Sequence, residues 1–216
     1  MAQIFRSVHN TLFRVSLSVI VLLGASSLWL AGAFERSPYK TLEKVPRDQP
    51  VPFSHQHHVG GIGIDCRYCH VSVETSRFAG IPAVSVCMNC HSQIWADSPA
   101  LAPVREASSR DQTIEWTRVN DLPDFVYFDH SIHVNKGVGC TTCHGRIDQM
   151  PLVWKANSLH MEWCLECHRN PEKYVRRRED VFKVDWEPPK NQREQGRALV
   201  EQYQIRKVTD CYGCHR

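Results

Sequence analysis

The sequence has little net charge, few periodic helix or strand patterns and no cysteine outside a pair. Its 26 lysines and arginines exceed its 23 acidic residues by three. Nucleic-acid binding usually relies on a strongly basic face, so this composition predicts no nucleic-acid partner. A length of 216 residues suits one ordinary domain, or two small ones.

The cysteines are the most informative residues. They form five pairs, each with two residues between the cysteines and each followed directly by a histidine. This is the pattern of covalent c-type haem attachment, in which both sulfurs bond one edge of the porphyrin and the histidine is the proximal iron ligand. Zinc sites, disulfides and thioredoxin-like pairs share the cysteine spacing but do not require the histidine. The sequence therefore predicts five covalently bound haems c, held by Cys66, Cys69, Cys87, Cys90, Cys140, Cys143, Cys164, Cys167, Cys211 and Cys214, with proximal ligands His70, His91, His144, His168 and His215.

An internal repeat sets the organisation of the chain. Residues 53–70, FSHQHHVGGIGIDCRYCH, align with residues 128–144, FDHSIHVNKGVGCTTCH, with a one-residue gap. Each copy is followed by a second motif, so we expect two dihaem units, at 53–91 and 128–168, and a fifth site at 211–215. Flat apolar cofactors would supply much of the core, which explains why side-chain periodicity is weak.

Each iron also needs a distal ligand, which decides whether a haem can bind a substrate or only pass electrons. Seven histidines remain after the proximal ligands are assigned. Four of them align between the two copies and are the predicted distal ligands: His55, His58, His130 and His133. His57 aligns with an isoleucine, so we expect it to be exposed or to lie beside a ligand. The pattern does not reveal which distal histidine serves which iron.

The fifth distal ligand has two candidates, His160 and Met161, directly before Cys164. The residues alone do not separate them, although a methionine would raise the reduction potential of its haem. Met88 and Met150 are expected to be packing residues. No motif has lysine in place of its histidine and the ligands suffice for all five irons, which disfavours an oxyanion reductase. A haem-based sensor would need a signalling segment that the sequence lacks.

The one long apolar run covers residues 15–34, which carry no charge and match the length that a helix needs to cross a bilayer. Arg6 and Arg14 precede it, so the positive-inside rule places residues 1–14 in the cytoplasm. A cleaved signal peptide is the alternative, because residues 31–33 resemble a cleavage site. We expect a single-pass protein of the cell inner (cytoplasmic) membrane, with a tether at 35–52 and a pentahaem domain at 53–216 on the periplasmic side.

Three segments outside the motifs carry further expectations. Residues 92–123 are expected to form a surface connection between the units. Residues 191–207 have apolar positions on one face and predict a short amphipathic helix. Arg176, Arg177 and Arg178 form a basic run. We expect this run to be solvated, with a role in docking partner proteins as a hypothesis.

These features resemble the pentahaem cytochrome c subunit of alternative complex III, a quinol-oxidising respiratory complex. The resemblance rests on the apolar span, both repeat segments, AGIPAVSVCMNCHSQI at 79–94 and LHMEWCLECHR at 159–169. It implies a mainly α-helical and irregular fold like the class III multihaem cytochromes, with almost no β-sheet. It also favours Met161 over His160, because the family commonly has Met-Gly before Trp-Cys. Glu162 departs from that pattern.

The resemblance further implies an electron-transfer protein that is not an enzyme on its own. It would relay electrons from a quinol-oxidising membrane complex to a periplasmic cytochrome or a terminal oxidase. The implied partners are iron-sulfur and multi-span quinol-binding subunits, a monohaem cytochrome c subunit or soluble carrier, and membrane lipid. The alternative is a stand-alone, membrane-anchored multihaem quinol dehydrogenase that feeds a periplasmic reductase.

Overall fold

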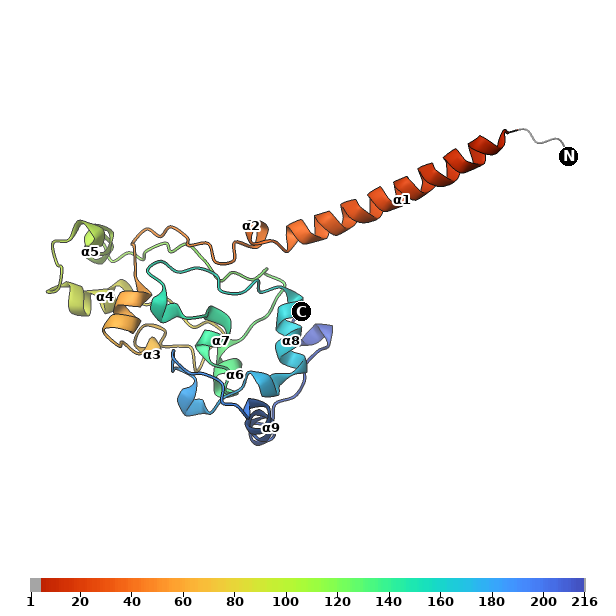
Figure 1. Cartoon of the computed structure of the whole chain (residues 1–216). Coiled ribbons are helices and arrows are strands. Elements are labelled where there is room, and N and C mark those ends of the chain that lie inside the picture. The colour runs from red at the N-terminus through yellow and green to blue at the C-terminus, as the bar shows by residue number, and fades with distance from the viewer. Residues whose placement is uncertain (1–4, 216) are drawn as a thin grey trace. The chain divides into compact units, whose positions relative to one another are not determined.

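The computed structural model describes residues 5–215 and divides the chain into two compact units, Met1–Glu43 and Lys44–Arg216 (Figure 1). The first four residues of the predicted cytoplasmic segment, and Arg216, lie outside the described residues. Each unit has its own internal contacts and its own architecture.

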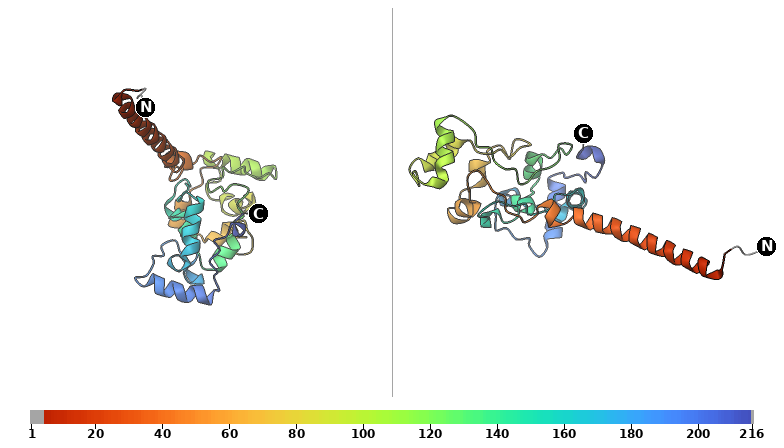
Figure 2. Two further views of the ribbon diagram at one scale, coloured as in Figure 1. Left: turned by 90° about the vertical axis from the view of Figure 1, so that its right-hand side faces the viewer. Right: turned by 90° about the horizontal axis from the view of Figure 1, so that it is seen from above.

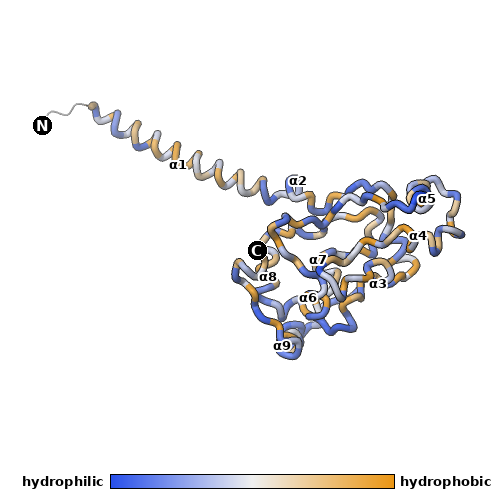
Figure 3. The backbone as a smooth tube through the Cα atoms, turned by 180° about the vertical axis from the view of Figure 1, so that it is seen from behind, coloured by the Kyte–Doolittle hydropathy of each residue, from blue (hydrophilic) through white to orange (hydrophobic). Residues whose placement is uncertain are grey.

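The first unit is dominated by one long helix. Helix α1, Ser7–Glu35, contains the whole of the predicted apolar run, and the four-residue helix α2, Pro38–Thr41, follows it. Figure 3 shows apolar residues spread along the length of α1. A helix that is apolar on all sides is typical of a lipid-facing segment. In the described part of the chain, α1 is the one helix long and apolar enough to cross a membrane, a property that a signal sequence shares.

The second unit consists of short helices joined by long irregular segments, as Figures 1 and 2 show. The described residues form isolated bridges but no β-strand. This confirms the predicted mainly helical and irregular fold with almost no sheet. The α-helices are α3 Cys66–Cys69, α4 Val84–His91, α5 Ala102–Ser109, α6 His130–Asn135, α7 Cys140–His144, α8 Met161–Arg169 and α9 Gln192–Gln202. A π-helix, η1 Gln56–Gly61, and the 3-10 turns η2 Pro99–Leu101, η3 Ile147–Gln149, η4 Pro171–Lys173, η5 Arg178–Asp180 and η6 Cys211–Gly213 complete the unit.

Two predicted loop segments contain structure. Helix α5 lies within the expected surface connection. It packs through Val104 and Ala107, which are one turn apart and are both buried. The last part of the expected tether pairs with the chain after the third motif, through a backbone hydrogen bond from Lys44 to Lys155 of 2.7 Å. The predicted amphipathic helix forms as α9, but it ends at Gln202 rather than continuing to residue 207.

The side-chain core of the second unit is small. Its main cluster contains Val73, Val134 and Val181, with Phe182 packed against it. Met150 is almost fully buried, in agreement with the expectation that it is a packing residue. Because this core is small, backbone hydrogen bonds and the haems predicted beside the motifs must order much of the unit.

The two copies of the repeat pack against each other reciprocally. The N–H of Gln56, next to the first distal histidine, donates to the carbonyl of Met150 in the second copy at 3.0 Å. At the aligned positions, the N–H of Ser131 in the second copy donates to the carbonyl of Ser76 in the first at 3.2 Å. Each segment of distal histidines is therefore held by the loop that follows the first haem motif of the other copy.

Candidate haem-binding sites

The attachment motifs lie on helical turns, as the cysteine spacing predicts. Four motifs are on the α-helices α3, α4, α7 and α8, and the fifth is on the 3-10 turn η6. Carboxylates cap the first and last of these turns: Asp65 accepts from the N–H of Arg67 at 2.8 Å, and Asp210 from that of Gly213 at 3.0 Å. None of the ten cysteines is held in a disulfide.

Three pairs of imidazole rings lie at a separation that fits one iron. The ring centroids are 6.4 Å apart for His130 and His144. They are 6.1 Å apart for His58 with His91, and also for His133 with His168. Two metal–imidazole bonds of about 2 Å, together with the ring radii, separate two axial ligands by about 6 Å. Each pair contains one predicted distal and one predicted proximal ligand, so the residues fit a porphyrin iron.

The pairing follows one rule in both copies. In each Phe-x-His-x-x-His segment, the second histidine lies opposite the histidine of that copy's second attachment motif. In the second copy, the first histidine, His130, lies opposite His144 of the first attachment motif. By the repeat, His55 corresponds to His130 and would pair with His70. Burial, and then the neighbouring His70, lower the pKa of His55 to about 4, so its imidazole is neutral, as an iron ligand must be. We propose these four pairs as the axial ligands of the first four haems.

Backbone carbonyls orient most of these rings. A ligating histidine usually donates its other N–H to a carbonyl, which leaves Nε2 free for the metal. Six predicted ligands place Nδ1 in this way: His58 on Ser54 (2.8 Å), His70 on Gly80 (2.7 Å), His91 on Ile94 (2.9 Å), His130 on Arg77 (2.8 Å), His133 on Asp129 (2.6 Å) and His215 on Phe125 (3.1 Å). Nδ1 of His55 is buried without a partner.

A phenylalanine at the start of each repeat segment contacts both predicted distal histidines of its copy. Phe128 stacks on His133, with ring centroids 4.4 Å apart, and meets His130 edge-on at 4.8 Å. Phe53 does the same with His58 at 4.4 Å and His55 at 4.9 Å. Both segments begin with phenylalanine in the sequence, but the sequence pattern alone predicted no role for this ring. Its recurrence two and five residues before the paired histidines was the available signal.

The first motifs of the two copies lie side by side. A hydrogen bond between the thiols of Cys66 and Cys140 lowers the pKa of Cys66 to about 7 and raises that of Cys140. Thioether formation would remove this hydrogen bond, but the closeness of the two attachment points would remain. We therefore propose that the haems at these two motifs connect the two predicted dihaem units.

The fifth motif lies beside the fourth and against residues 125–127. Tyr127 donates its N–H to the carbonyl of Cys214 at 2.8 Å. Burial, and then the neighbouring Cys214, raise the pKa of Cys164 in α8. Helix α8 begins at Met161, whose side chain is exposed, and His160 occupies the N-cap position without a side-chain capping hydrogen bond. Both candidates for the fifth distal ligand thus lie one turn before Cys164, and we propose Met161.

Two further sequence expectations concern residues near these sites. His57 is exposed and stacks on Trp95 at 5.3 Å, in agreement with its exclusion from the ligand set. The prediction of a solvated basic run is wrong for Arg176, which is only 3% exposed. Gly139 opens the space that its guanidinium fills, and Gly137 lets the backbone of Arg176 approach closely, a tertiary effect that the run of arginines could not reveal.

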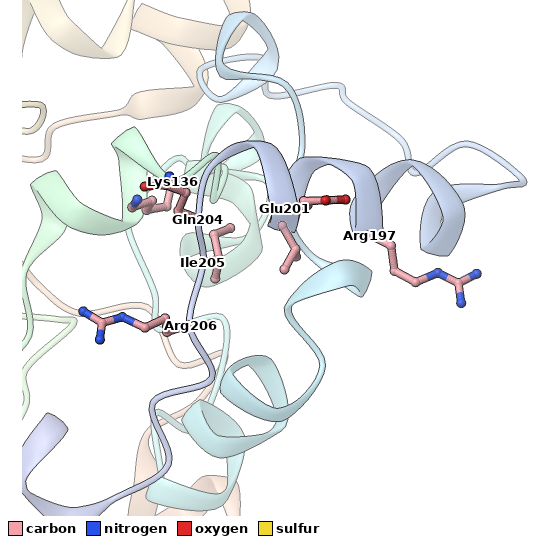
Figure 4. Close-up of a pocket in the computed structure, with 7 residues that line it drawn as sticks. Lys136, Arg197, Glu201, Gln204, Ile205 and Arg206 are labelled. Atoms are coloured by element: carbon pink, nitrogen blue, oxygen red, sulfur yellow. The ribbon is translucent and has the colours of Figure 1, made fainter.

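A pocket of about 630 Å³ lies between α9 and the end of α6 (Figure 4). It contains more cationic than acidic groups and none of the predicted haem ligands. Its lining residues are Lys136, Arg197, Val200, Glu201, Gln204, Ile205 and Arg206.

Residues 126–216 match the model of the family described as cytochrome c7 and related cytochrome c. This chain is a multihaem cytochrome c. Five attachment motifs make it a cytochrome for five covalent haems. Over 99 residues, this multihaem cytochrome is 35% identical to the menaquinone reductase, multiheme cytochrome c subunit of Nitratidesulfovibrio vulgaris strain Hildenborough. The alignment covers 45% of this chain and 46% of the relative, so the chain spans about half the length of the curated relative that it matches.

Proposed function

We propose that this multihaem cytochrome is the electron-transfer subunit of a quinone-linked membrane complex. The observation that carries the proposal is the set of imidazole pairs 6.1 to 6.4 Å apart. An iron with two protein ligands has no open position, so it passes electrons rather than binding a substrate. When bound, the haems supply one-electron redox chemistry. The residues of this chain attach them, fix their axial ligands and hold the two dihaem units together.

The direction of electron flow is part of the proposal. The relative is named as a subunit of a menaquinone reductase, which supports menaquinone as the quinone and reduction of the quinone as the working direction. Electrons would then come from a redox protein on the periplasmic side. The resemblance to alternative complex III supports the opposite direction, from quinol to a periplasmic cytochrome or terminal oxidase. Both directions use the same relay of haems, and activity of the isolated complex separates them.

Partner subunits would supply the quinone chemistry. One apolar helix, α1, cannot by itself enclose a quinone, so we propose iron-sulfur and multi-span subunits as neighbours in the complex. We also propose that α1 is retained as an anchor and that the haem unit lies on the periplasmic side, where c-type haem is attached in bacteria. In that arrangement the haem unit stands between the membrane partners and the soluble redox protein.

The test is extraction of the native membrane with a mild detergent, followed by isolation of this chain through its haem stain. We expect multi-span and iron-sulfur partners to co-purify, and we expect menaquinone reduction when a reduced periplasmic cytochrome is the donor. Quinol oxidation without the reverse activity would favour the assignment to alternative complex III. A partner-free cytochrome that oxidises quinol would support a stand-alone quinol dehydrogenase, and one with neither activity would refute the proposal.

A further inference from the structure

Arg176 is a buried cation directly beneath the third attachment motif. Its backbone N–H donates to the carbonyl of Gly137 at 2.8 Å, which aligns the two segments side by side. Nη2 of its guanidinium donates to Oγ1 of Thr141 at 3.1 Å and of Thr142 at 3.2 Å. These threonines are the two residues between Cys140 and Cys143. The charge is therefore fixed to the turn that attaches this haem.

The remaining contacts of Arg176 leave its charge without a carboxylate partner. Nη1 reaches only the backbone carbonyls of Asp180 and Lys183, both at 3.4 Å, and Nε is buried with no acceptor. The guanidinium carbon lies 4.1 Å above the ring of Trp186. The carboxylate of Asp180 is nearby but is bound by Arg177 and Lys183, and within residues 5–215 no ion pair to Arg176 forms.

The first copy of the repeat is built differently at the same place. There, Arg67 of the motif pairs with Asp65 through two hydrogen bonds of 2.9 Å, and both side chains are about half exposed. The aligned positions in the second copy are Gly139 and Thr141, which carry no charge. A β-carbon at Gly139 would overlap the guanidinium of Arg176. The second copy has thus exchanged a solvated ion pair for a buried, unpaired cation.

We propose that Arg176 is a positioning residue that raises the reduction potential of the haem at Cys140 and Cys143 above that of the haem at Cys66 and Cys69. Reduction of a ferric haem removes one positive charge, so a fixed cation nearby disfavours the oxidised form. Burial strengthens this effect because the surroundings screen the charge poorly. The inference rests on the proposed haem at this motif, and it sets the favoured direction of electron transfer between the adjacent first motifs of the two copies.

The test is a potentiometric titration of the purified full-length protein with all five haems, followed by EPR and by visible absorbance. The planes of His130 and His144 are 5° apart, whereas those of the other two pairs are 69° and 76° apart. Nearly parallel imidazoles give a rhombic low-spin signal and nearly perpendicular ones a highly anisotropic signal, so the two classes titrate separately. In Arg176→Met, we expect the equilibrium constant for reduction of one rhombic haem to fall about tenfold, which lowers its reduction potential by about 59 mV.

Three further variants and a measurement at high salt isolate the charge. Arg176→Lys should restore most of the potential, and Arg176→Gln should lower it as Arg176→Met does while keeping a hydrogen-bonding side chain. Arg67→Gln is the matched control in the first copy. It should change the equilibrium constant for reduction of the haem at Cys66 and Cys69 by less than about threefold, since the ion pair of Arg67 is exposed and weak. The Arg176→Met shift should also persist at high salt, because buried charges are poorly screened.

Unchanged potentials in a five-haem Arg176→Met or Arg176→Gln protein would overturn the proposal, as would an equal shift in Arg176→Lys. Loss of the haem at Cys140 in both neutral variants, with all five retained in Arg176→Lys, would show a role in haem attachment and would also overturn it. Mass and haem content are measured on the unaltered protein first. Fewer than five haems there would contradict the proposed attachment sites, which is a separate failure.

Discussion

The imidazole planes of His130 and His144 are almost parallel, 5° apart, with their centroids 6.4 Å apart. The pair joins the first predicted distal histidine of the second copy to the predicted proximal histidine of its first motif. The pairs that serve the second motifs have planes nearly at right angles. The geometry therefore predicts two classes of haem, one with nearly parallel and one with nearly perpendicular axial imidazoles.

These two classes predict the EPR spectrum of the oxidised protein. We expect both rhombic and highly anisotropic low-spin signals, with at least two haems in the anisotropic class. Replacement of His133 by methionine should remove one anisotropic component and leave the rhombic ones. A spectrum with rhombic signals alone would contradict the proposed pairs.

Phe128 should control both distal ligands of the second copy, because its ring contacts His130 and His133. In Phe128→Ala, loss of a half-buried ring should lower stability by about 1–2 kcal/mol. The EPR lines of the second-copy haems should broaden as their ligand rings lose a fixed orientation. Phe53→Ala is the matched variant and should broaden the lines of the other copy. Identical spectral changes in the two variants would argue against a local role.

Met161 should be the distal ligand of the fifth haem. In Met161→Ala, we expect the ferric protein to lose the far-red absorbance band of methionine-ligated haem, with a lower potential for that haem. His160→Ala should leave the band in place. If the band is absent from the unaltered protein and His160→Ala converts one haem to high spin, then His160 is the ligand.

Gly139 should be intolerant of any side chain, because a β-carbon would overlap the guanidinium of Arg176. We expect Gly139→Ala to lower the free energy of unfolding by about 1–3 kcal/mol, the usual cost of overpacking. Gly61→Ala is the control, since a β-carbon there meets only the carbonyl of Gln56 at 3.7 Å. Urea unfolding of both variants measures the difference, and equal stabilities would show that Arg176 can move aside freely.

The buried carboxylate of Asp180 should make stability depend on pH. Hydrogen bonds from Lys183 and then Arg177 hold the pKa of Asp180 below its usual value. A carboxyl with a lowered pKa in the folded state stabilises the protein at neutral pH, and this contribution is lost as pH falls through the folded pKa. Asp180→Asn should therefore be less stable than the unaltered protein at pH 7, with the gap closing below about pH 4. A gap that is constant with pH would exclude this linkage.

Spacing in the sequence predicted features formed by neighbouring residues, such as the attachment motifs. It did not predict features that depend on contacts between distant segments. The attachment cysteines and proximal histidines could be proposed from spacing because each motif is one helical turn. The pairing of His58 with His91 depends on how distant segments meet, which no spacing encodes. Helix α5 was missed because only two of its residues, Val104 and Ala107, are buried. Arg176 was misplaced because Gly137 and Gly139 make room for it from another segment.

The reciprocal hydrogen bonds from Gln56 to Met150 and from Ser131 to Ser76 have a consequence for how this protein is made. Neither segment of predicted distal histidines is held in place until the other copy has been synthesised. A haem attached early would sit beside an unanchored histidine segment until the second copy arrives. The two copies therefore depend on each other for the geometry of their predicted ligands.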